Sequence, residues 1–464
     1  MIRFLHAYFP GRTLLLGISE GCLVALAFLT ATIVRLGTND ASLVLSYEQG
    51  FVKIVVVSVA FITCMYYFDL YDSSILNNPR EVLTRMIQMQ GTVCIFLAGF
   101  YYIYPALELA RGIFLIGFIL VAMLLLLWRR LFLSLNTLTQ FAERALIFGD
   151  SPLANALAAE LRTHPELGIH VAGQLKSVDN GNGRLILTSS DEQLAAVMNS
   201  VTPYEPDRII VALSERRGQL PVEALLQLKS HGVRIQDGGE AYETLTGKVP
   251  IDSLHLSWLL FSPGFRVSRP LVIYKRIASL VLSSAGLVLA LPLMALTALA
   301  VRLDSVGPVI FQQKRVGQDG KFFTLYKFRT MVDGADHDDN HPPAEESDIR
   351  FTRIGRLLRR TRMDELPQLF NILRGDMCFV GPRPFVPSQE RDCSEKIPYY
   401  RQRWVVKPGA TGWAQVNRGY NVTIEDNKEK LAYDLFYIKN ISVGLDLLIL
   451  FKTIKILLLG RGSR

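Results

Sequence analysis

Long apolar stretches dominate the first third of the chain, and polar residues are confined to the short segments between them. The stretches cover residues 13–34, 51–68, 88–105 and 112–128. Each has about the length of the roughly 20 residues that a helix needs to cross the hydrocarbon core of a bilayer. The pattern therefore predicts a four-helix transmembrane bundle over residues 1–135.

Basic residues around these stretches predict how the bundle is oriented. Arg3 and Arg12 precede the first stretch, Arg80 and Arg85 lie between the second and the third, and Arg129 closes the fourth. Segments that stay in the cytoplasm carry an excess of lysine and arginine. We therefore expect both ends of the bundle, and the chain that follows it, to face the cytoplasm.

A fifth apolar stretch, residues 277–301, has basic residues on both sides. Lys275 and Arg276 precede it and Arg302 follows it, so both flanks are predicted to be cytoplasmic. Pro292 removes a hydrogen bond in the middle of the stretch and kinks the helix. A re-entrant helix that dips into the bilayer, breaks at Pro292 and returns satisfies both flanks. A straight fifth span is the alternative, and it would place the rest of the chain on the far side of the membrane.

The region between these membrane segments, residues 141–265, has the pattern of a Rossmann-like α/β domain. Strands are expected at 144–149, 207–213 and 232–236, with a helix at 153–161. The first strand leads into Gly149, but the other two glycines of a dinucleotide-binding turn are missing, and Pro152 and Leu153 would hinder a pyrophosphate. The sequence therefore favours a regulatory or assembly role over nucleotide binding.

Composition supports a membrane protein and narrows the partners. Half of the residues are hydrophobic, and the mean hydropathy is +0.25. A formal net charge of +8 suits nucleic acid, anionic lipid headgroups or phosphorylated substrates. The apolar stretches favour membrane lipids and phosphates, so no nucleic acid partner is expected. The five cysteines show no metal-ligand spacing and no disulfide pattern.

Basic motifs become dense after residue 307. Residues 307–331 read as a β-hairpin that turns at 318–320 and carries Lys327 and Arg329 as candidate phosphate ligands. An arginine-rich helix is predicted over 350–362, either lying on anionic headgroups or clamping substrate phosphates. A weak D-x-D metal signature, Asp336-His-Asp338, lies in the acidic loop before that helix.

The arginine-rich helix runs into Asp364 and Glu365. A carboxylate among arginines stays ionised and can serve as a nucleophile or as a magnesium ligand. In Gly381-Pro-Arg-Pro384 two prolines fix the backbone around Arg383. A nucleophile, Mg²⁺ and fixed positive charge are what phosphoryl transfer requires.

Four ordered motifs in residues 270–464 strongly resemble the bacterial sugar transferases called monotopic phosphoglycosyl transferases. The motifs are Asp364-Glu-Leu-Pro-Gln-Leu-Phe-Asn371, Gly375-Asp-Met377, Gly381-Pro-Arg-Pro384 and Lys407-Pro-Gly-Ala-Thr-Gly-Trp-Ala-Gln-Val416. With its four spans and Rossmann-like domain, the whole chain resembles the long undecaprenyl-phosphate hexose phosphotransferases that initiate exopolysaccharide synthesis. The tail over 419–440 is most similar to the branch found with exosortase-linked polysaccharide loci.

The resemblance implies a ping-pong reaction on the cytoplasmic face of a bacterial inner membrane. Asp364 matches the residue that attacks the β-phosphate of a UDP-sugar, releases UMP and holds the sugar phosphate until undecaprenyl phosphate accepts it. Glu365 matches the magnesium-associated glutamate, and Arg359 and Arg383 match phosphate-binding positions.

This sequence departs from the family at two positions in the predicted re-entrant helix. Leu291-Pro292 replaces the usual Ser-Pro break, and Ser279 replaces an aspartate. Both changes concern how the helix is held in the membrane rather than the chemistry.

Two other protein classes are compatible with parts of the pattern. Membrane-anchored nucleotide-sugar dehydratases also begin with four spans, but they need a complete glycine fingerprint and a Tyr-x-x-x-Lys pair, and none of the 17 tyrosines has lysine four positions later. A catalytically inactive scaffold for polysaccharide assembly is the other alternative, and the intact Asp364 and Glu365 argue against it. No motif identifies the sugar, and the extent of the membrane structure is compatible with a homodimer.

Overall fold

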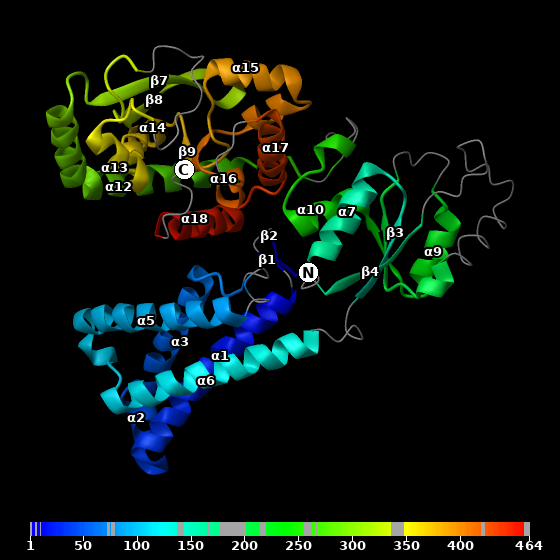
Figure 1. The fold of residues 1–464 in the computed structure, drawn as a ribbon, viewed down its shortest axis with the longest axis vertical. Helices are drawn as coiled ribbons and strands as arrows, with labels where there is room; N and C mark the ends of the chain where they lie inside the picture. Colours follow the sequence, from blue (N-terminus) through cyan, green and yellow to red (C-terminus); the bar gives the residue numbers. More distant parts are fainter. Residues whose placement is uncertain are drawn as a thin grey trace. The chain divides into compact units, whose positions relative to one another are not determined.

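A computed structural model describes most of the chain. The described residues are 2–4, 7–9, 11–71, 75, 79–136, 143–164, 168–175, 201–213, 220–254, 262, 264–265, 268–335, 348–418 and 423–458. They divide into two compact units, with the main division between Gly238 and Gly239. Figure 1 shows the elements of both units, coloured along the sequence.

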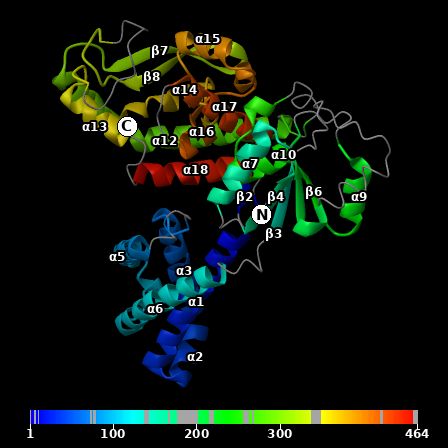
Figure 2. The same cartoon turned by 45° about the vertical axis from the view of Figure 1, so that its right-hand side comes forward.

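Long apolar helices of the first unit cover the four stretches in which spans were predicted. The helices of this region are α1 (Gly11–Leu36), α2 (Thr38–Tyr47), α3 (Gly50–Tyr67), α5 (Pro79–Ile103) and α6 (Arg111–Asn136), with the short strands β1 (Ile2–Phe4) and β2 (Ala7–Phe9) before them and the turn η1 (Pro105–Leu107) between the last two. Helices α1 and α6 run side by side in both views of the ribbon (Figures 1 and 2). The short helix α2 was not predicted.

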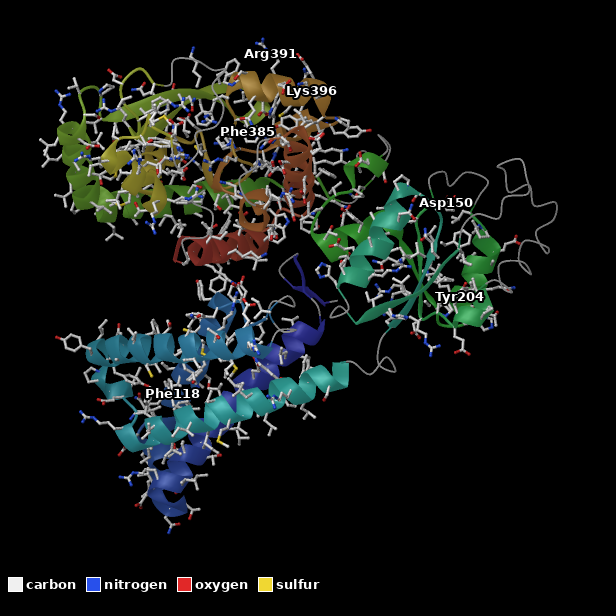
Figure 3. All side chains as sticks on the ribbon, in the orientation of Figure 1. Phe118, Asp150, Tyr204, Phe385, Arg391 and Lys396 are labelled. Carbon is white, nitrogen blue, oxygen red and sulfur yellow. The ribbon has the colours of Figure 1, made fainter. Side chains whose placement is uncertain are left out.

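Aromatic side chains and one ion pair fill the interior of this bundle. Phe118 packs against Phe61 and Phe114, at ring distances of 5.2 and 4.6 Å, and is labelled in Figure 3. Arg129 donates from Nε to the buried carboxylate of Glu20 at 2.6 Å. A buried charge is tolerated in such a place when it is paired. The exterior keeps many exposed apolar side chains, as a lipid-facing surface requires.

A four-stranded parallel sheet lies in the middle region, where an α/β domain was predicted. Its strands are ordered β4-β3-β5-β6, from β3 (Glu143–Phe148), β4 (Ile169–Leu175), β5 (Arg208–Val211) and β6 (Arg234–Asp237). The described helical elements of this region are α7 (Pro152–Thr163), α9 (Val222–Ser230) and the turn η4 (Thr202–Tyr204).

The turn after β3 packs directly against the backbone that follows β5. Gly149 has φ +131°, and a Cβ there would lie 2.4 Å from the carbonyl oxygen of Ala212, so glycine is required by the neighbouring strand. Ser151 caps α7 by accepting a hydrogen bond from the amide of Ala154. Asp150 stands exposed between them (Figure 3). Glycine therefore has a structural reason here that needs no bound pyrophosphate.

The second unit contains the predicted β-hairpin and all the motifs of the C-terminal third that the structure describes. Its first elements are α10 (Gly238–Thr246), η5 (Ile251–Ser253), α12 (Arg269–Asp304), β7 (Ile310–Val316), η6 (Gln318–Gly320), β8 (Phe322–Phe328), α13 (Arg353–Thr361), η7 (Met363–Glu365) and α14 (Gln368–Arg374). They are followed by β9 (Cys378–Val380), α15 (Pro387–Lys396), η8 (Tyr400–Val405), β10 (Gly409–Thr411), α16 (Trp413–Asn417), α17 (Ile424–Lys439) and α18 (Val443–Leu458). Strands β7 and β8 pair antiparallel, and β9 and β10 pair parallel.

Helix α12 contains the fifth apolar stretch. It is assigned as one helix of 36 residues with Pro292 inside it, which corresponds to about 54 Å if straight. Among the described residues, α12 and the four helices of the bundle are long and apolar enough to cross a bilayer. The chain is therefore a membrane protein that combines membrane helices with α/β structure.

Candidate active site

Asp364 and Glu365 lie on the short 3₁₀ turn η7, between helices α13 and α14. Arg362 makes the sharp connection by adopting a left-handed conformation, with φ +58°. The turn that follows places Asp364 in the interior of the unit and leaves Glu365 half-buried. Asp364 retains 8% of its exposure.

Three cations contact the carboxylate of Glu365. Lys327, on β8, donates from Nζ to Oε1 at 3.0 Å, and Arg383 donates from Nη2 to the same oxygen at 3.3 Å. Arg362 lies 3.9 Å from Oε2. Lys327 also lies 3.9 Å from Oδ2 of Asp364. The sequence predicted Lys327 and Arg383 near the pair, but it did not single out Arg362.

The pKa values of the two carboxylates are shifted in opposite directions. Burial raises the pKa of Asp364, and the charge of Lys327 only partly opposes that rise. Burial also acts on Glu365, but the charges of Lys327, Arg383 and Arg362 outweigh it and hold the pKa of Glu365 well below its usual range. The lowered pKa keeps Glu365 ionised near neutral pH, whereas Asp364 is the more basic of the two carboxylates. A raised pKa makes an ionised carboxylate a better nucleophile.

Asn371 fixes the strand that carries Lys327. Its side chain is fully buried and accepts a hydrogen bond at Oδ1 from the amide of Tyr326, at 3.1 Å. Its Nδ2 donates to the carbonyl of Thr324 at 2.7 Å and to Asp376 at 3.3 Å. The sequence placed Asn371 in a motif but gave it no role, because its partners lie 45 and 47 residues earlier in the chain.

Arg403 fixes the loop that carries Arg383. It is 5% exposed and donates from Nη2 to the carbonyl oxygen of Arg383 at 2.9 Å. The same guanidinium forms ion pairs with Asp434 at 3.0 Å and Glu390 at 3.4 Å. The sequence analysis missed this residue, since nothing in a run of ordinary polar residues marks it as buried.

The other residues proposed from the sequence lie in different surroundings. Arg359 is exposed on α13, with its guanidinium 4.4 Å above the ring of Phe351, and its charge lowers the pKa of Asp364. Arg329 is buried and donates from Nη2 to the carbonyl and hydroxyl of Ser305, at 2.7 and 2.8 Å. It therefore ties β8 to the end of α12. Pro292 lies within α12.

The residues present fit a magnesium ion only if the substrate supplies most of its ligands. No group of three or more His, Cys, Asp or Glu side chains gathers as a metal site within the described ranges. Mg²⁺ usually takes one or two carboxylates together with substrate phosphates. Glu365 meets that requirement, since its lowered pKa keeps it ionised and the guanidinium of Arg362 lies 3.9 Å from its Oε2, beyond hydrogen-bond distance. Asp336-His-Asp338 lies outside the described residues.

Comparison with known proteins identifies the family. Residues 271–460 match the profile of the family described as bacterial sugar transferase, and residues 66–236 match one described as a CoA-binding domain. A UDP-glucose:undecaprenyl-phosphate glucose-1-phosphate transferase of Klebsiella pneumoniae is 34% identical over 317 residues, which are 67% of this chain and 67% of that protein. The chain belongs to the bacterial sugar transferase family.

Two further relatives of this sugar transferase carry related names. A UDP-N-acetylgalactosamine-undecaprenyl-phosphate N-acetylgalactosaminephosphotransferase of Aeromonas hydrophila is 43% identical over 226 residues, 48% of this chain and 52% of that protein. An undecaprenyl-phosphate glucose phosphotransferase of Komagataeibacter xylinus is 32% identical over 338 residues, 70% of this chain and 60% of that protein. The match thus spans between about half and two thirds of each of these three relatives.

Proposed function

We propose that the chain transfers a hexose 1-phosphate from a UDP-sugar to undecaprenyl phosphate, giving undecaprenyl-diphosphate-sugar and UMP. The observation that carries the proposal is the adjacent pair of buried Asp364 and half-buried Glu365, with Lys327, Arg362 and Arg383 around it. A UDP-sugar and a lipid phosphate are both anionic, and fixed cations stabilise charge on a transferring phosphoryl group. The names of the three relatives support the same reaction.

In the proposed ping-pong reaction, two displacements occur at one phosphorus. A carboxylate oxygen of Asp364 attacks the β-phosphorus of the UDP-sugar, and the bond from that phosphorus to the bridging oxygen breaks as UMP leaves. A phosphate oxygen of undecaprenyl phosphate then attacks the same phosphorus of the aspartyl phosphosugar. The bond to Asp364 breaks, and the carboxylate is restored. Its raised pKa makes Asp364 the better nucleophile, and Glu365, held by three cations, is the poorer one.

Magnesium is part of the proposal as a cofactor held by Glu365. When bound, it would neutralise charge on the diphosphate. Lys327, Arg362 and Arg383 bind phosphate oxygens from their positions around the pair, and the burial of Asp364 excludes water that would hydrolyse the intermediate.

A re-entrant α12 is supported by contacts at both of its ends. At the start, Lys275 forms an ion pair with Asp446 at 2.9 Å. At the end, Asp304 accepts a hydrogen bond from the amide of Ile354 at 3.0 Å, and Ser305 binds Arg329. Both ends thus pack on the same unit, whereas a straight helix of 36 residues would carry them to opposite sides of a bilayer core of about 30 Å. We propose that α12 breaks at Pro292 and that the unit faces the cytoplasm at the bacterial inner membrane.

For the sugar and the pathway we propose a class only. The named relatives act with glucose or N-acetylgalactosamine, so a hexose or an N-acetylated hexosamine is expected. Initiation of exopolysaccharide synthesis follows from the resemblance in the motifs. A homodimer stays a prediction.

The test is UMP release from a panel of UDP-sugars by the full-length protein in detergent, with Mg²⁺ and undecaprenyl phosphate. We expect release with at least one sugar and its loss in Asp364→Asn. Asp392→Asn is the control, because it changes a half-exposed carboxylate on α15 of the same unit that pairs locally with Lys396. No release with any UDP-sugar would favour the inactive scaffold. Equal release by wild type and Asp364→Asn would show that the nucleophile is a different residue.

A further inference from the structure

The segment between β6 and α12 lies outside both matched families. The two profiles cover residues 66–236 and 271–460. Within the gap, residues 239–254 contain most of α10 and all of η5, and they belong to the compact second unit. We call residues 239–254 the strap.

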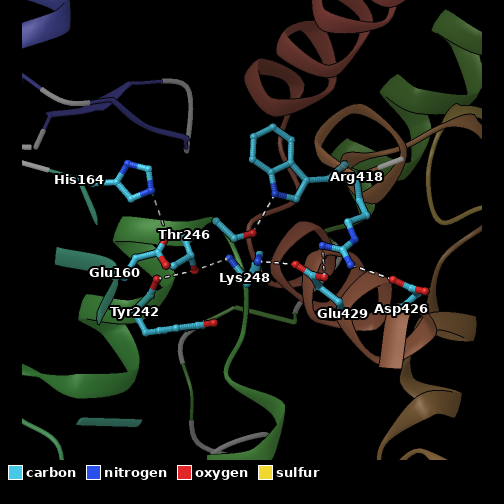
Figure 4. A network of polar contacts seen from close by, with 10 residues as sticks. Glu160, His164, Tyr242, Thr246, Lys248, Arg418, Asp426 and Glu429 are labelled. Atoms are coloured by element: carbon cyan, nitrogen blue, oxygen red, sulfur yellow. Dashed lines mark hydrogen bonds and ion pairs between the residues drawn. The ribbon is translucent and has the colours of Figure 1, made fainter. Parts of the chain in front are cut away.

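Polar contacts fix the strap to helix α17. Lys248 forms an ion pair with Glu429 at 2.5 Å, which Figure 4 shows together with the pairing of Glu429 to Arg418. The amide of Val249 donates to the carbonyl of Ala432 at 3.1 Å. Glu243 is buried and pairs with Lys439 at 2.8 Å. A free linker would make none of these contacts, so the strap is a structured part of the second unit.

The strap also touches the indole of Trp413, in the last of the four motifs. Trp413 donates from Nε1 to the carbonyl of Gly247 at 2.9 Å. Gly247 has φ +66°, and a Cβ there would lie 3.2 Å from the indole. Elsewhere the indole stacks near Phe436, at 5.9 Å, and Lys452 lies 4.6 Å from its centre. The strap therefore completes the surroundings of this side chain.

Trp413 directly follows the strand that holds the Arg383 loop. The amide of Gly381 donates to the carbonyl of Thr411 at 2.9 Å, and the amide of Gly409 donates to the carbonyl of Pro382 at 3.0 Å. At Gly412 a Cβ would lie 2.2 Å from the carbonyl oxygen of Gly381, so the two backbones are in direct contact. Arg383, which reaches Glu365, is the second residue after Gly381.

We propose that the strap is a positioning element of the transfer site: by holding Trp413 through Gly247, it fixes the backbone of 409–412 and thereby the place of Arg383. The proposal rests on the proposed function in one respect, that Arg383 binds the diphosphate of the donor. Gly247 and Trp413 are positioning residues, since neither contacts the carboxylate pair.

Loss of the indole hydrogen bond should weaken donor binding. Trp413→Phe keeps an aromatic ring beside Phe436 and Lys452 but removes the donor to Gly247. We expect KM for the UDP-sugar in UMP release to rise by about three- to tenfold, the factor that one hydrogen bond typically contributes. Partial unfolding would lower the rate per milligram and leave KM unchanged, so KM separates positioning from mere destabilisation.

Matched controls exist for two variants. Trp128→Phe removes an indole hydrogen bond of 3.0 Å to Ser19 in the other unit. Gly247→Ala strains a left-handed residue and pushes on the indole, whereas Gly232→Ala strains one (φ +94°) with no atom within 4 Å of its added Cβ. We expect KM to rise in Trp413→Phe and Gly247→Ala and to stay within about twofold of wild type in both controls.

A double-mutant cycle tests the route through Arg383. If Trp413 acts through Arg383, Trp413→Phe should raise KM in the wild type and have no further effect in an Arg383→Ala background. Unchanged KM in both Trp413→Phe and Gly247→Ala would overturn the proposal. An equal additional rise in KM in the Arg383→Ala background would overturn it as well.

Hydrogen exchange provides a readout that needs no substrate. The amides of Gly381 and Gly409 should exchange faster in Trp413→Phe than in wild type and Trp128→Phe, because their partners lie on the loosened segment. Faster exchange without UMP release from any UDP-sugar would contradict the proposed function and leave the strap's effect on this loop standing. Unchanged exchange of these two amides would contradict the positioning role proposed for the strap.

Discussion

Replacement of Asn371 tests whether the site depends on a buried side chain that makes no contact with the reacting carboxylates. Asn371→Ala removes the acceptor for the amide of Tyr326 and the donor to the carbonyl of Thr324. Both backbone groups lie on β8, on the edge that does not pair with β7. Among the described strands, β8 pairs with β7 alone, so no second strand takes over from the side-chain amide. The strand that presents Lys327 therefore loses its attachment to α14.

The expected loss of stability follows from two unsatisfied groups. Each buried donor or acceptor left without a partner costs about 1–3 kcal/mol, so two cost about 2–6 kcal/mol. Because water has partial access to β8, we expect a loss in the lower part of this range, about 2–4 kcal/mol. At about 2–4 °C per kcal/mol for a unit of this size, the melting temperature should fall by about 4–16 °C.

Thermal unfolding in detergent measures this loss, with the fluorescence of Trp404 and Trp413 reporting on the second unit. Asn440→Ala is the matched control, because its Nδ2 makes one local hydrogen bond to Phe436 at 3.0 Å, and it should lower the melting temperature by only a few degrees. KM for the UDP-sugar should also rise in Asn371→Ala, since Lys327 is displaced. Equal melting temperatures for the two variants would refute the reasoning.

The remaining predictions concern charge in the site. Lys327→Met should move the acid limb of the UMP-release profile to higher pH, because burial already raises the pKa of Asp364 and Lys327 is the largest of the charges that lower it. An unmoved limb in a pH–rate profile would contradict this. EDTA should abolish UMP release. Glu365→Gln should need a higher Mg²⁺ concentration than wild type for half-maximal UMP release. Equal half-maximal Mg²⁺ concentrations in the two proteins would exclude Glu365 as the ligand. Arg403→Met should lower stability by about 3–5 kcal/mol, because it leaves Glu390 and Asp434 buried without their cation; unfolding by denaturant checks it, and Arg401→Met, an exposed neighbour, should have little effect.

The membrane helices could be predicted from the sequence because lipid imposes a simple rule. Every spanning helix must satisfy its own backbone and remain apolar over about 20 residues, and the four predicted stretches became α1, α3, α5 and α6. The hairpin was predictable for a similar local reason, since Gly317 and Gly320 bracket a polar turn between two alternating segments. In each case the signal lies within the element itself.

The support of the site could not be predicted, because it depends on residues distant in sequence. Asn371 binds a strand 45 residues earlier, and Arg403 binds Asp434 31 residues later. Polar residues of these types are usually exposed, so the sequence gives no sign that folding buries them. The strap was missed for another reason: Gly247 and Lys248 lie within residues 141–265, all of which the sequence analysis assigned to the middle domain. The predicted boundary of that domain at residue 265 stays a prediction, although the compact second unit begins at Gly239.

The central claim is that Asp364 carries the sugar phosphate between two half-reactions. Wild-type protein should be incubated with Mg²⁺ and the UDP-sugar that it accepts, without undecaprenyl phosphate, then denatured, digested and analysed by mass spectrometry. The account predicts a hexose-phosphate adduct on the peptide that contains Asp364, one equivalent of UMP per adduct, and loss of the adduct when undecaprenyl phosphate is added. Release of UMP only in the presence of the lipid, with no adduct at any time, or an adduct on a different residue, would contradict it.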